Sequence, residues 1–207
     1  MTRAGSCRYF RPDPVPDDVL YSLFDVVRFA PSGGNRQPVR YIVVRDQASR
    51  TRLRDLYLRA WTPYLDKLEA GSITTPNRPS VVESADHFAR HLDQIPALIM
   101  VCARIADLHV TDAALDRVSI VGGASVYPSV QNLILACRDL ELGAALTTLL
   151  VEFEPEIKEL LDVPPEFAVA GTVAVGYPAQ KLTTRLRRLP AEEIVSLDRF
   201  GEALPRP

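Results

Sequence analysis

Two runs of the chain are apolar at almost every position. The run "PALIMVCAR" spans residues 96–104, and "FAVAGTVAVGYP" spans residues 167–178. Apolar runs of this length predict strands that are buried inside a sheet. Two further β-rich runs, "VRYIVVRD" at residues 39–46 and "AALTTLL" at residues 144–150, predict additional strands. Helical patterns separate these runs along the chain, so the sequence predicts an α+β fold in which helices cover a sheet.

Four stretches outside these runs have the apolar spacing of helices. The first begins with Asp17 and Asp18 after Pro16 and places its apolar residues on one face as far as Val27. A preceding proline and acidic residues in the first turn suit a helix N-terminus, so we expect the helix to begin there. The other three predicted helices span residues 48–68, 87–95 and 152–163.

A fifth stretch, residues 118–143, is longer and apolar on nearly every side. This pattern predicts a helix that is buried in the core or across a subunit interface, and Gly143 suits its C-terminal end. By contrast, residues 69–84 have weak periodicity and contain two prolines. We expect this second segment to form a mobile loop or lid.

The length of 207 residues is that of one ordinary domain. We therefore expect a single domain over residues 1–207. Within it, we expect a lid-like excursion at about residues 62–88 and a C-terminal arm at residues 180–207.

Charge and cysteine usage exclude several classes of protein. The net charge of −2 shows no basic excess, so we expect neither nucleic acid nor a membrane as a partner. No apolar run reaches the ~18 residues of a membrane span, and the first residues lack the apolar segment of a secretory signal. The three cysteines are far apart in the chain, which favours a reducing compartment over a disulfide framework. We expect a cytoplasmic protein.

The common nucleotide and metal motifs are absent from the sequence. The chain has neither G-x-G-x-x-G nor a Walker A sequence, so the sequence supports neither a Rossmann nor a P-loop site. His87 and His91 have the spacing of two metal ligands on one helical face. The segment "HFARH" lacks the glutamate of a zinc protease, and a solvated helix face explains it better. We expect no metal.

Three polar features are far apart in the sequence. They are "SCRYF" with Ser6 and Arg8, the loop at residues 31–37, and Thr147–Leu150 together with the pair Arg187 and Arg188. Each alone has an ordinary structural explanation as a surface arginine, a turn, a strand or a solvated tail. Together they offer positive charge for an anion, small residues for close approach and amides that can bind a ring edge. This combination suits a planar cofactor with a phosphate group.

Five segments match motifs of a known family. "APSGGNRQP" at residues 30–38 is similar to the signature A-P-S-[SG]-x-N-x-Q-P, and "SCRYF" at residues 6–10 is similar to R-R-S-x-R-x-F. "QNLILACRDLELGA" at residues 131–144 matches a long central helix, and "VGYPAQ" followed by "RRLPAEEIV" at residues 187–195 matches the family's C-terminal end. In these motifs, and in their order and spacing over nearly the whole chain, the sequence resembles the nitroreductase family of FMN-dependent oxidoreductases.

The resemblance implies an α+β fold with the nitroreductase-like three-layer sandwich, in which a mixed, mostly antiparallel sheet is flanked by helices. It also implies an intertwined homodimer with two FMN sites at the subunit interface, each lined by residues of both subunits. NADH or NADPH is the implied co-substrate.

The resemblance assigns one group of residues to the phosphate and one face of the flavin. Arg187 and Arg188 would bind the FMN phosphate together with Ser6. Arg8 would face flavin N1 and the C2 carbonyl, where positive charge stabilises the reduced flavin. Arg3 is expected to take the place of the family's first phosphate-binding arginine, which this chain lacks directly before Ser6.

A second group would reach the flavin from two other segments. From the opposite subunit would come the loop residues Pro31, Ser32, Gly33, Asn35 and Gln37, where glycine lets the backbone approach the ring. Thr147, Thr148 and Leu149 would pass close to the flavin ring, and a backbone N–H of this segment would donate to flavin N5. We also expect the open flavin face to be covered by Trp61, Tyr64 and residues 74–82.

The implied chemistry is a ping-pong reaction. NAD(P)H passes a hydride to flavin N5, and a nitroaromatic, quinone or similar small oxidant then takes the electrons. The flavin carries the chemistry, so no catalytic protein residue is assigned. Three alternatives stay open: a dehalogenase-like or flavin-fragmenting enzyme of the same fold, an FMN-storing or FMN-sensing protein without turnover, and a dimeric interaction protein that uses the apolar stretch at residues 118–142.

Overall fold

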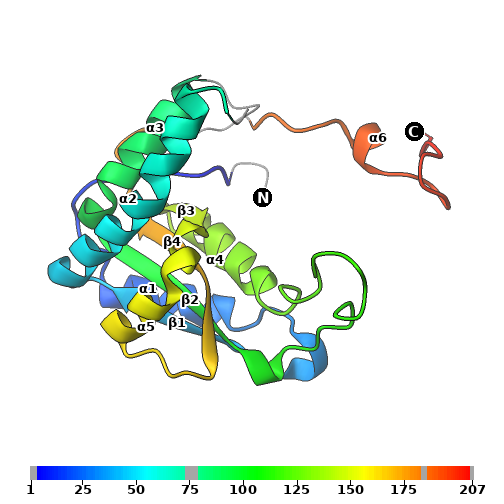
Figure 1. Ribbon diagram of the computed structural model, residues 1–207, viewed down its shortest axis with the longest axis horizontal. Coiled ribbons are helices and arrows are strands. Elements are labelled where there is room, and N and C mark those ends of the chain that lie inside the picture. Colours follow the sequence, from blue (N-terminus) through cyan, green and yellow to red (C-terminus); the bar gives the residue numbers. More distant parts are fainter. Residues whose placement is uncertain (1–3, 73–78, 183–185, 206–207) are drawn as a thin grey trace.

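The computed structural model describes residues 4–72, 79–182 and 186–205, and a four-stranded sheet forms its centre (Figure 1). The strand order is β1-β2-β4-β3, and all three pairs of neighbouring strands are antiparallel. The strands are β1 (Val39–Val44), β2 (Ala97–Arg104), β3 (Gly143–Thr147) and β4 (Phe167–Gly176). The two continuous apolar runs of the sequence are the two inner strands, β2 and β4, as expected for strands that are buried on both faces.

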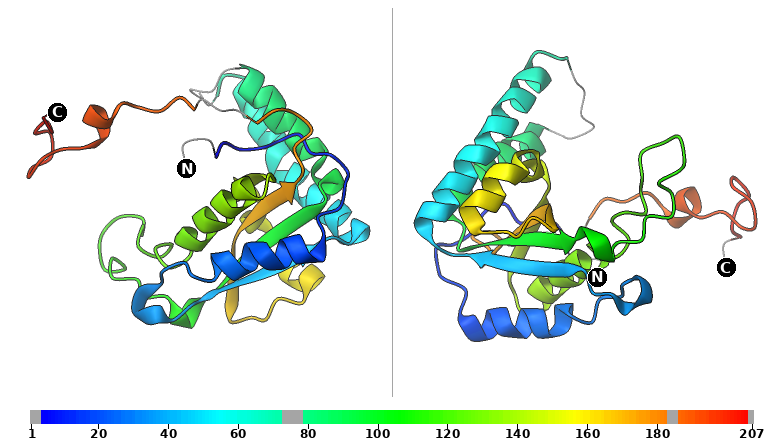
Figure 2. Two further views of the ribbon diagram at one scale, coloured as in Figure 1. Left: turned by 180° about the vertical axis from the view of Figure 1, so that it is seen from behind. Right: turned by 60° about the horizontal axis from the view of Figure 1, so that its bottom comes forward.

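Helices cover both faces of the sheet, so the predicted three-layer α+β architecture is confirmed (Figure 2). Successive side chains of a strand point to opposite faces, which divides the core into two clusters. Ile99 and Val173 pack with α1 (Asp17–Val27) and α4 (Tyr127–Asp139). The other face carries Leu98, Met100 and Ala174, which pack against α2 (Gln47–Glu69), α3 (Pro79–Arg90) and α5 (Glu154–Leu161).

Short helices connect or follow these elements. The 3₁₀ helices are η1 (Gly33–Asn35), η2 (Leu92–Gln94), η3 (Ile105–Asp107) and η4 (Leu149–Phe153). The last helix, α6 (Ala191–Ile194), belongs to a C-terminal segment that extends away from the body of the molecule (Figure 1). The expected strand at residues 144–150 is shorter than predicted, because η4 begins at Leu149. Among the described residues, no helix has both the length and the apolar character of a membrane span.

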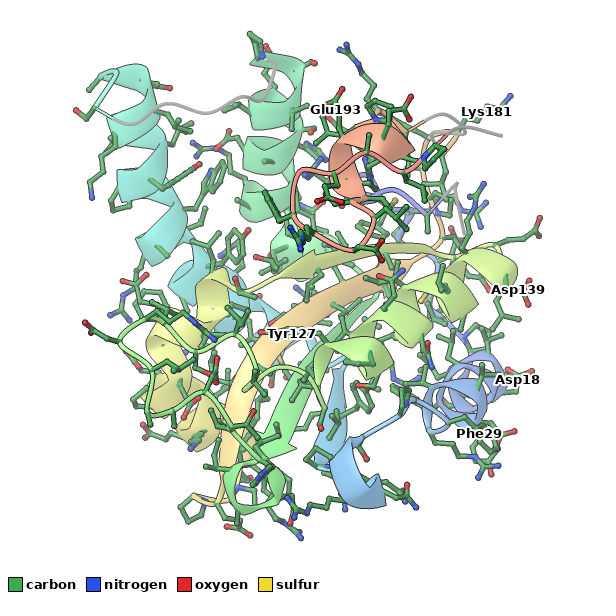
Figure 3. All side chains as sticks on the ribbon, turned by 90° about the vertical axis from the view of Figure 1, so that its right-hand side faces the viewer. Asp18, Phe29, Tyr127, Asp139, Lys181 and Glu193 are labelled. Carbon is green, nitrogen blue, oxygen red and sulfur yellow. The ribbon has the colours of Figure 1, made fainter. Side chains whose placement is uncertain are left out.

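The predicted helix over residues 118–143 is only half right. α4 begins at Tyr127, and the preceding segment is a loop (Figure 3). In this loop, Val118 and Ile120 are 86% and 77% exposed. The buried carboxylate of Asp112 accepts hydrogen bonds from the amides of Ile120 and Val121, among others.

A side chain that binds these amides competes directly with the backbone carbonyls of a helix. Asp112 also accepts from the Ser119 hydroxyl at 2.7 Å and from Arg117 at 2.8 Å. The bonds from Ser119, from the Ile120 amide and from Arg117 lower the pKa of Asp112 to about 2. Pro128, near the N-terminus of α4, suits a helix start and not a helix interior.

The predicted loop at residues 69–84 is also shorter than expected. Residues 79–84 form the first turns of α3, so the expectation of irregular structure there is wrong. Residues 73–78 lie outside the described residues, and so does most of the segment expected to cover the flavin. Trp61 is 6% exposed and donates from Nε1 to Asp86 at 2.9 Å, which joins α2 to α3. Its indole is therefore part of the core, whereas Tyr64 beside it is 40% exposed.

The N-terminal segment lies along the end of the sheet at β3 and β4. The Cys7 amide donates to the Ala144 carbonyl at 2.9 Å, and Phe10 forms an isolated antiparallel β-bridge with Pro178. Gly143 makes this approach possible, because a Cβ there would lie 2.5 Å from Cys7 Sγ and 2.6 Å from Cys7 Cβ. The position of Ser6 and Arg8 therefore depends on the absence of a side chain at residue 143.

We expect Gly143→Ala to destabilise the fold by about 1–3 kcal/mol, because the added methyl group must push the Cys7 backbone away from β3. Urea denaturation measures the effect. Gly122→Ala is the matched control, since a Cβ there meets its nearest atoms only at 3.7 Å and 3.9 Å. Equal stability of the two variants would contradict the close approach.

A stack of three rings joins this segment to α3. The His87 ring lies 4.4 Å from the Tyr9 ring and 4.2 Å from the His91 ring, measured between centroids. Partial burial and the nearby His91 lower the pKa of His87, while the carboxylate of Asp86 opposes that shift. Folding thus favours the neutral form of His87. The expectation of a fully solvated helix face is wrong for this residue, because its ring is stacked between two others.

Folding stability should therefore fall on mild acidification. The contribution of His87 is complete above the ordinary histidine pKa of 6.5 and is lost as the pH falls through the lowered pKa of the folded state. Urea midpoints at pH 7.5 and pH 5.0 should differ less in His87→Gln than in the wild type. His109→Gln, which changes an exposed histidine, should keep the wild-type difference.

Candidate functional site

The first part of the candidate site gathers around the end of β3. Thr147 is the last residue of β3, and its Oγ1 lies 3.2 Å from the hydroxyl of Tyr57 on α2. Arg8 of the N-terminal segment donates from Nη1 to Ser84 Oγ of α3 at 3.4 Å. Burial raises the pKa of Tyr57, while the bond to Thr147 and the charge of Arg8 act against that shift. Thr147 thus contacts Tyr57 directly, and the charge of Arg8 acts on the same tyrosine.

Tyr57 belongs to this cluster at the end of β3, and the sequence analysis did not predict it. It lies on the apolar side of a charged helix, where a tyrosine is most simply explained as core. The available signal was a hydroxyl group on that apolar side, since a buried tyrosine hydroxyl usually has a polar partner.

Arg8 keeps its positive charge available for an anion. It is half-buried, yet none of the ion pairs between described residues includes Arg8. Burying a guanidinium without a carboxylate is costly unless a ligand supplies the negative charge. Ser6, two residues earlier, is exposed. Arg3 lies outside the described residues.

The residues that follow Thr147 form a tight turn. Thr148 is exposed, and Leu149 begins η4. The Leu149 amide donates to Thr147 Oγ1 at 3.4 Å, and the Val151 amide donates to the Thr148 carbonyl at 3.0 Å. Thr147 Oγ1 is therefore shared between the turn and Tyr57.

The second part of the candidate site is the loop between α1 and β1. Gly34, Asn35 and Gln37 all have positive φ, at 58°, 51° and 49°. Glycine and asparagine tolerate this conformation better than other residues, which explains part of the loop's composition. The loop is held by its own polar groups: the Gln37 amide donates to Ser32 Oγ at 3.0 Å, and Gln37 Nε2 donates to Asn35 Oδ1 at 3.1 Å.

The loop is also fixed to the body of the protein, because the Gly33 amide donates to the Ser125 hydroxyl at 3.0 Å. Pro31, Gly33 and Asn35 remain exposed, while Ser32 is partly buried. The surplus of small and amide residues thus builds a rigid loop that presents backbone and side-chain groups outward.

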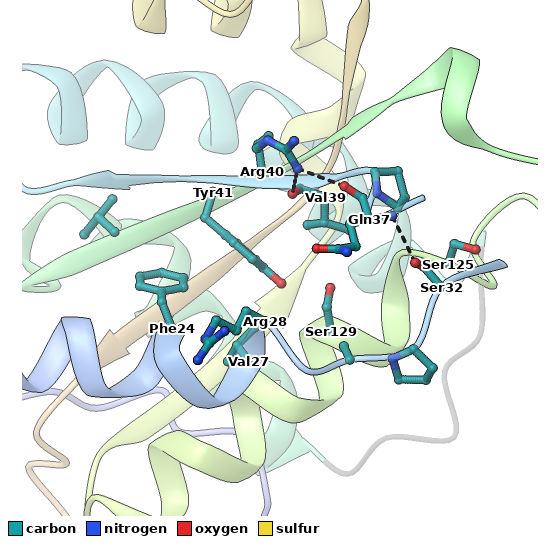
Figure 4. A pocket seen from close by; sticks show the side chains of 14 residues that line it. Phe24, Val27, Arg28, Ser32, Gln37, Val39, Arg40, Tyr41, Ser125 and Ser129 are labelled. Atoms are coloured by element: carbon teal, nitrogen blue, oxygen red, sulfur yellow. Dashed lines mark hydrogen bonds between the residues drawn. The ribbon is translucent and has the colours of Figure 1, made fainter. Parts of the chain in front are cut away.

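Behind the loop is a cavity of about 470 Å³ between α1, β1 and the start of α4 (Figure 4). The hydroxyl groups of Tyr41 and Ser129 point into it, and Arg28 and Arg40 lie at its border (Figure 4). Arg40 Nη1 donates to the carbonyls of Gln37 and Val39, so the loop and β1 are tied together at this wall.

The two parts lie at opposite edges of the sheet. The loop leads into β1, whereas Thr147 ends β3, and β2 and β4 lie between these two outer strands. At a spacing of ~4.8 Å between neighbouring strands, β1 and β3 are roughly 14 Å apart. Within a single chain, the structure therefore does not bring residues 31–37 to Arg8 and Thr147.

The arginine pair expected at the phosphate is in the C-terminal segment. Arg187 and Arg188 are exposed, and Arg188 Nη1 donates only to the Arg187 carbonyl among the contacts between described residues. All described residues from 187 to 205 are exposed, and Phe200 is fully so. No hydrogen bond or ion pair between described residues joins this pair to Ser6 or Arg8. No group of three or more histidine, cysteine or acidic side chains suited to a metal occurs in the described part.

Comparisons with known proteins agree on one family. The sequence model of the Nitroreductase family matches residues 2–177. An NADH dehydrogenase of Thermus thermophilus is 28% identical over 200 residues, which cover 92% of this chain and 90% of that protein. A 5,6-dimethylbenzimidazole synthase of Rhodospirillum rubrum is 27% identical over 213 residues, which cover 97% and 85%.

The fold agrees as well. The crystal structure of an iodotyrosine deiodinase bound to FMN and 3-iodo-L-tyrosine superimposes with a TM-score of 0.69 at 21% identity, over 96% of this chain and 95% of that one. Since the family model spans most of its length, this chain belongs to the nitroreductase family.

Proposed function

We propose that this chain is an FMN-dependent oxidoreductase that transfers a hydride from NADH or NADPH, by way of the flavin, to a nitroaromatic, quinone or similar small oxidant. The observation that carries the proposal is the half-buried Arg8, which has no carboxylate partner among the described residues and lies in the same polar cluster as Thr147. In a member of the nitroreductase family, such a group suits the electron-rich side of a flavin.

The residues present fit FMN in their chemistry. A phosphate needs guanidinium and hydroxyl groups, and Ser6, Arg187 and Arg188 offer these groups without an acidic partner among the described ion pairs. The flavin ring needs small residues, and the rigid loop with Gly33 and Gly34 offers its backbone. When bound, FMN would supply the hydride-accepting and hydride-donating chemistry.

The protein's own part is to bind and orient. Arg8 would place positive charge where a reduced flavin is richest in electrons, which favours reduction. Thr147, Thr148 and Leu149 would form the wall behind the ring, and the α2–α3 side would border the space for substrates. No side chain is required as a nucleophile, in keeping with a reaction carried by the cofactor.

We propose a homodimer as the functional form, because the two parts of the site lie at opposite edges of one chain's sheet. A second copy can bring its residues 31–37 to Arg8 and Thr147 of the first. The C-terminal arm supports the same arrangement, since it extends away from the body of the molecule and exposes apolar side chains that a second copy could cover. These side chains are Leu189, Ile194, Val195, Leu197, Phe200 and Leu204.

The nicotinamide as electron donor is supported by the name of the Thermus thermophilus relative, an NADH dehydrogenase. The deiodinase and the dimethylbenzimidazole synthase show that proteins similar to this chain carry other names as well. The electron donor and the oxidant therefore have to be measured directly.

The decisive measurement is an absorbance spectrum of the purified protein with FMN, followed by anaerobic addition of NADH or NADPH. We expect bound oxidised flavin that loses its visible absorbance with one nicotinamide and regains it with a quinone. Bound flavin that neither nicotinamide reduces would favour a storage protein or a dehalogenase-like enzyme. A protein that takes up no FMN would contradict the proposal.

Arg8→Ala should weaken FMN binding by about tenfold or more, since a charge-assisted contact in a partly buried place contributes roughly 1.5–3 kcal/mol. Quenching of flavin fluorescence on binding gives the dissociation constant. Arg52→Ala, at an exposed position of α2, serves as control and should leave the constant unchanged. Equal constants in the two variants would exclude Arg8 from the site.

The proposed homodimer leads to a separate prediction. Light scattering should give twice the chain mass of 22.9 kDa. Removal of residues 186–207 should lower FMN affinity and shift the protein towards the monomer, because it removes both the exposed arm and the arginine pair. A monomer that binds FMN stoichiometrically would overturn the proposal that two copies complete the site.

A further inference from the structure

Tyr57 has a polar contact that its packing does not require. The residue is 4% exposed, and its ring packs edge-on against Phe88 with centroids 6.0 Å apart. A phenylalanine would satisfy that packing equally well. The tyrosine hydroxyl instead lies 3.2 Å from Thr147 Oγ1, and the charge of Arg8 acts on it.

The hydrogen-bonding capacity of Thr147 is limited. A threonine hydroxyl has one proton to donate and can accept two hydrogen bonds. Thr147 Oγ1 already accepts one from the Leu149 amide at 3.4 Å. If Tyr57 donates the second, both accepting positions are occupied, and the Thr147 proton is left for a third group.

The charge of Arg8 bears on which of the two hydroxyls donates. A guanidinium is always charged and can only donate, so the lone pairs of a nearby tyrosine oxygen turn towards it. Either hydroxyl can donate in the 3.2 Å contact between Tyr57 and Thr147. Positive charge near the Tyr57 oxygen favours Tyr57 as the donor.

We infer that Tyr57 is a positioning residue: together with Arg8, it fixes the Thr147 hydroxyl as a hydrogen-bond donor towards the flavin. The inference rests on the proposed function, in which Thr147 and Arg8 line the flavin. It adds that Tyr57, which does not itself contact the cofactor, controls the polarity of the wall beside it.

The direction of the bond has a consequence for the cofactor. The acceptor atoms of a flavin become richer in electrons on reduction, so a fixed donor stabilises the reduced form more than the oxidised form. Loss of the Tyr57 hydroxyl frees Thr147 to turn and to accept, which weakens FMN binding and makes the midpoint potential of the bound flavin more negative. A tyrosine that only fills the core would affect neither quantity when replaced by phenylalanine.

The test uses the purified full-length protein with FMN itself as the probe. Tyr57→Phe removes only the hydroxyl, and Tyr64→Phe is the matched control, because Tyr64 lies on the same helix and is 40% exposed. Thr147→Val and the double variant Tyr57→Phe/Thr147→Val complete a double-mutant cycle. Thr147→Ser keeps the hydroxyl and serves as a second control. For each, the dissociation constant of FMN and the midpoint potential of bound FMN are measured.

Tyr57→Phe should weaken FMN binding roughly threefold to tenfold, as expected for one hydrogen bond, and should shift the potential to a more negative value. Thr147→Val should show at least the same loss, and the double variant should be no worse than Thr147→Val alone. Thr147→Ser and Tyr64→Phe should behave like the wild type.

Each contrary outcome has a distinct meaning. If the wild type binds no FMN, the proposed function fails and the inference fails with it. If the wild type binds FMN and Tyr57→Phe matches Tyr64→Phe in both quantities, only the inference is overturned. Additive losses in the double variant also overturn it, because Tyr57 would then act without Thr147. Should Tyr57→Phe not fold, equal behaviour of Thr147→Val and Thr147→Ser would overturn it.

Discussion

The pairing of the two apolar strands β2 and β4 at the centre of the sheet determines the arrangement of everything else. Their side chains supply both core clusters, so helices must cover both faces and the two outer strands must lie at opposite edges. The loop at residues 31–37 enters at one edge, and Thr147 ends the strand at the other. The separation of the two halves of the candidate site thus follows directly from strand order.

Much of this could be predicted from the sequence because the relevant signals are local. The inner strands were evident from uninterrupted apolar runs, and α1 was evident from Pro16, the acidic first turn and a one-sided apolar pattern. The site loop and Arg8 were predicted from family motifs, and their role at a flavin stays a prediction. A periodic or motif-bearing segment carries its structure in adjacent residues, and such segments agree with the fold.

The errors occurred where a distant group determined the local structure. Residues 118–126 are apolar enough for a helix, but the Asp112 carboxylate takes the amides that a helix would need. Trp61 was expected at an open face, yet Asp86 on another helix holds its indole in the core. Tyr57 was missed because its partner, Thr147, is ninety residues away in the chain. No pattern in neighbouring residues reports such contacts.

Strand order also bears on genetics. In the proposed homodimer, a second molecule would complete each pocket, because the two halves of the candidate site lie at opposite edges of one chain's sheet. Two alleles, one damaged at the glycine-rich turn and one at the guanidinium near the amino terminus, would each be inactive alone. Co-expressed, they would assemble mixed pairs with one pocket built from intact halves only, so intragenic complementation becomes an expected property of this architecture.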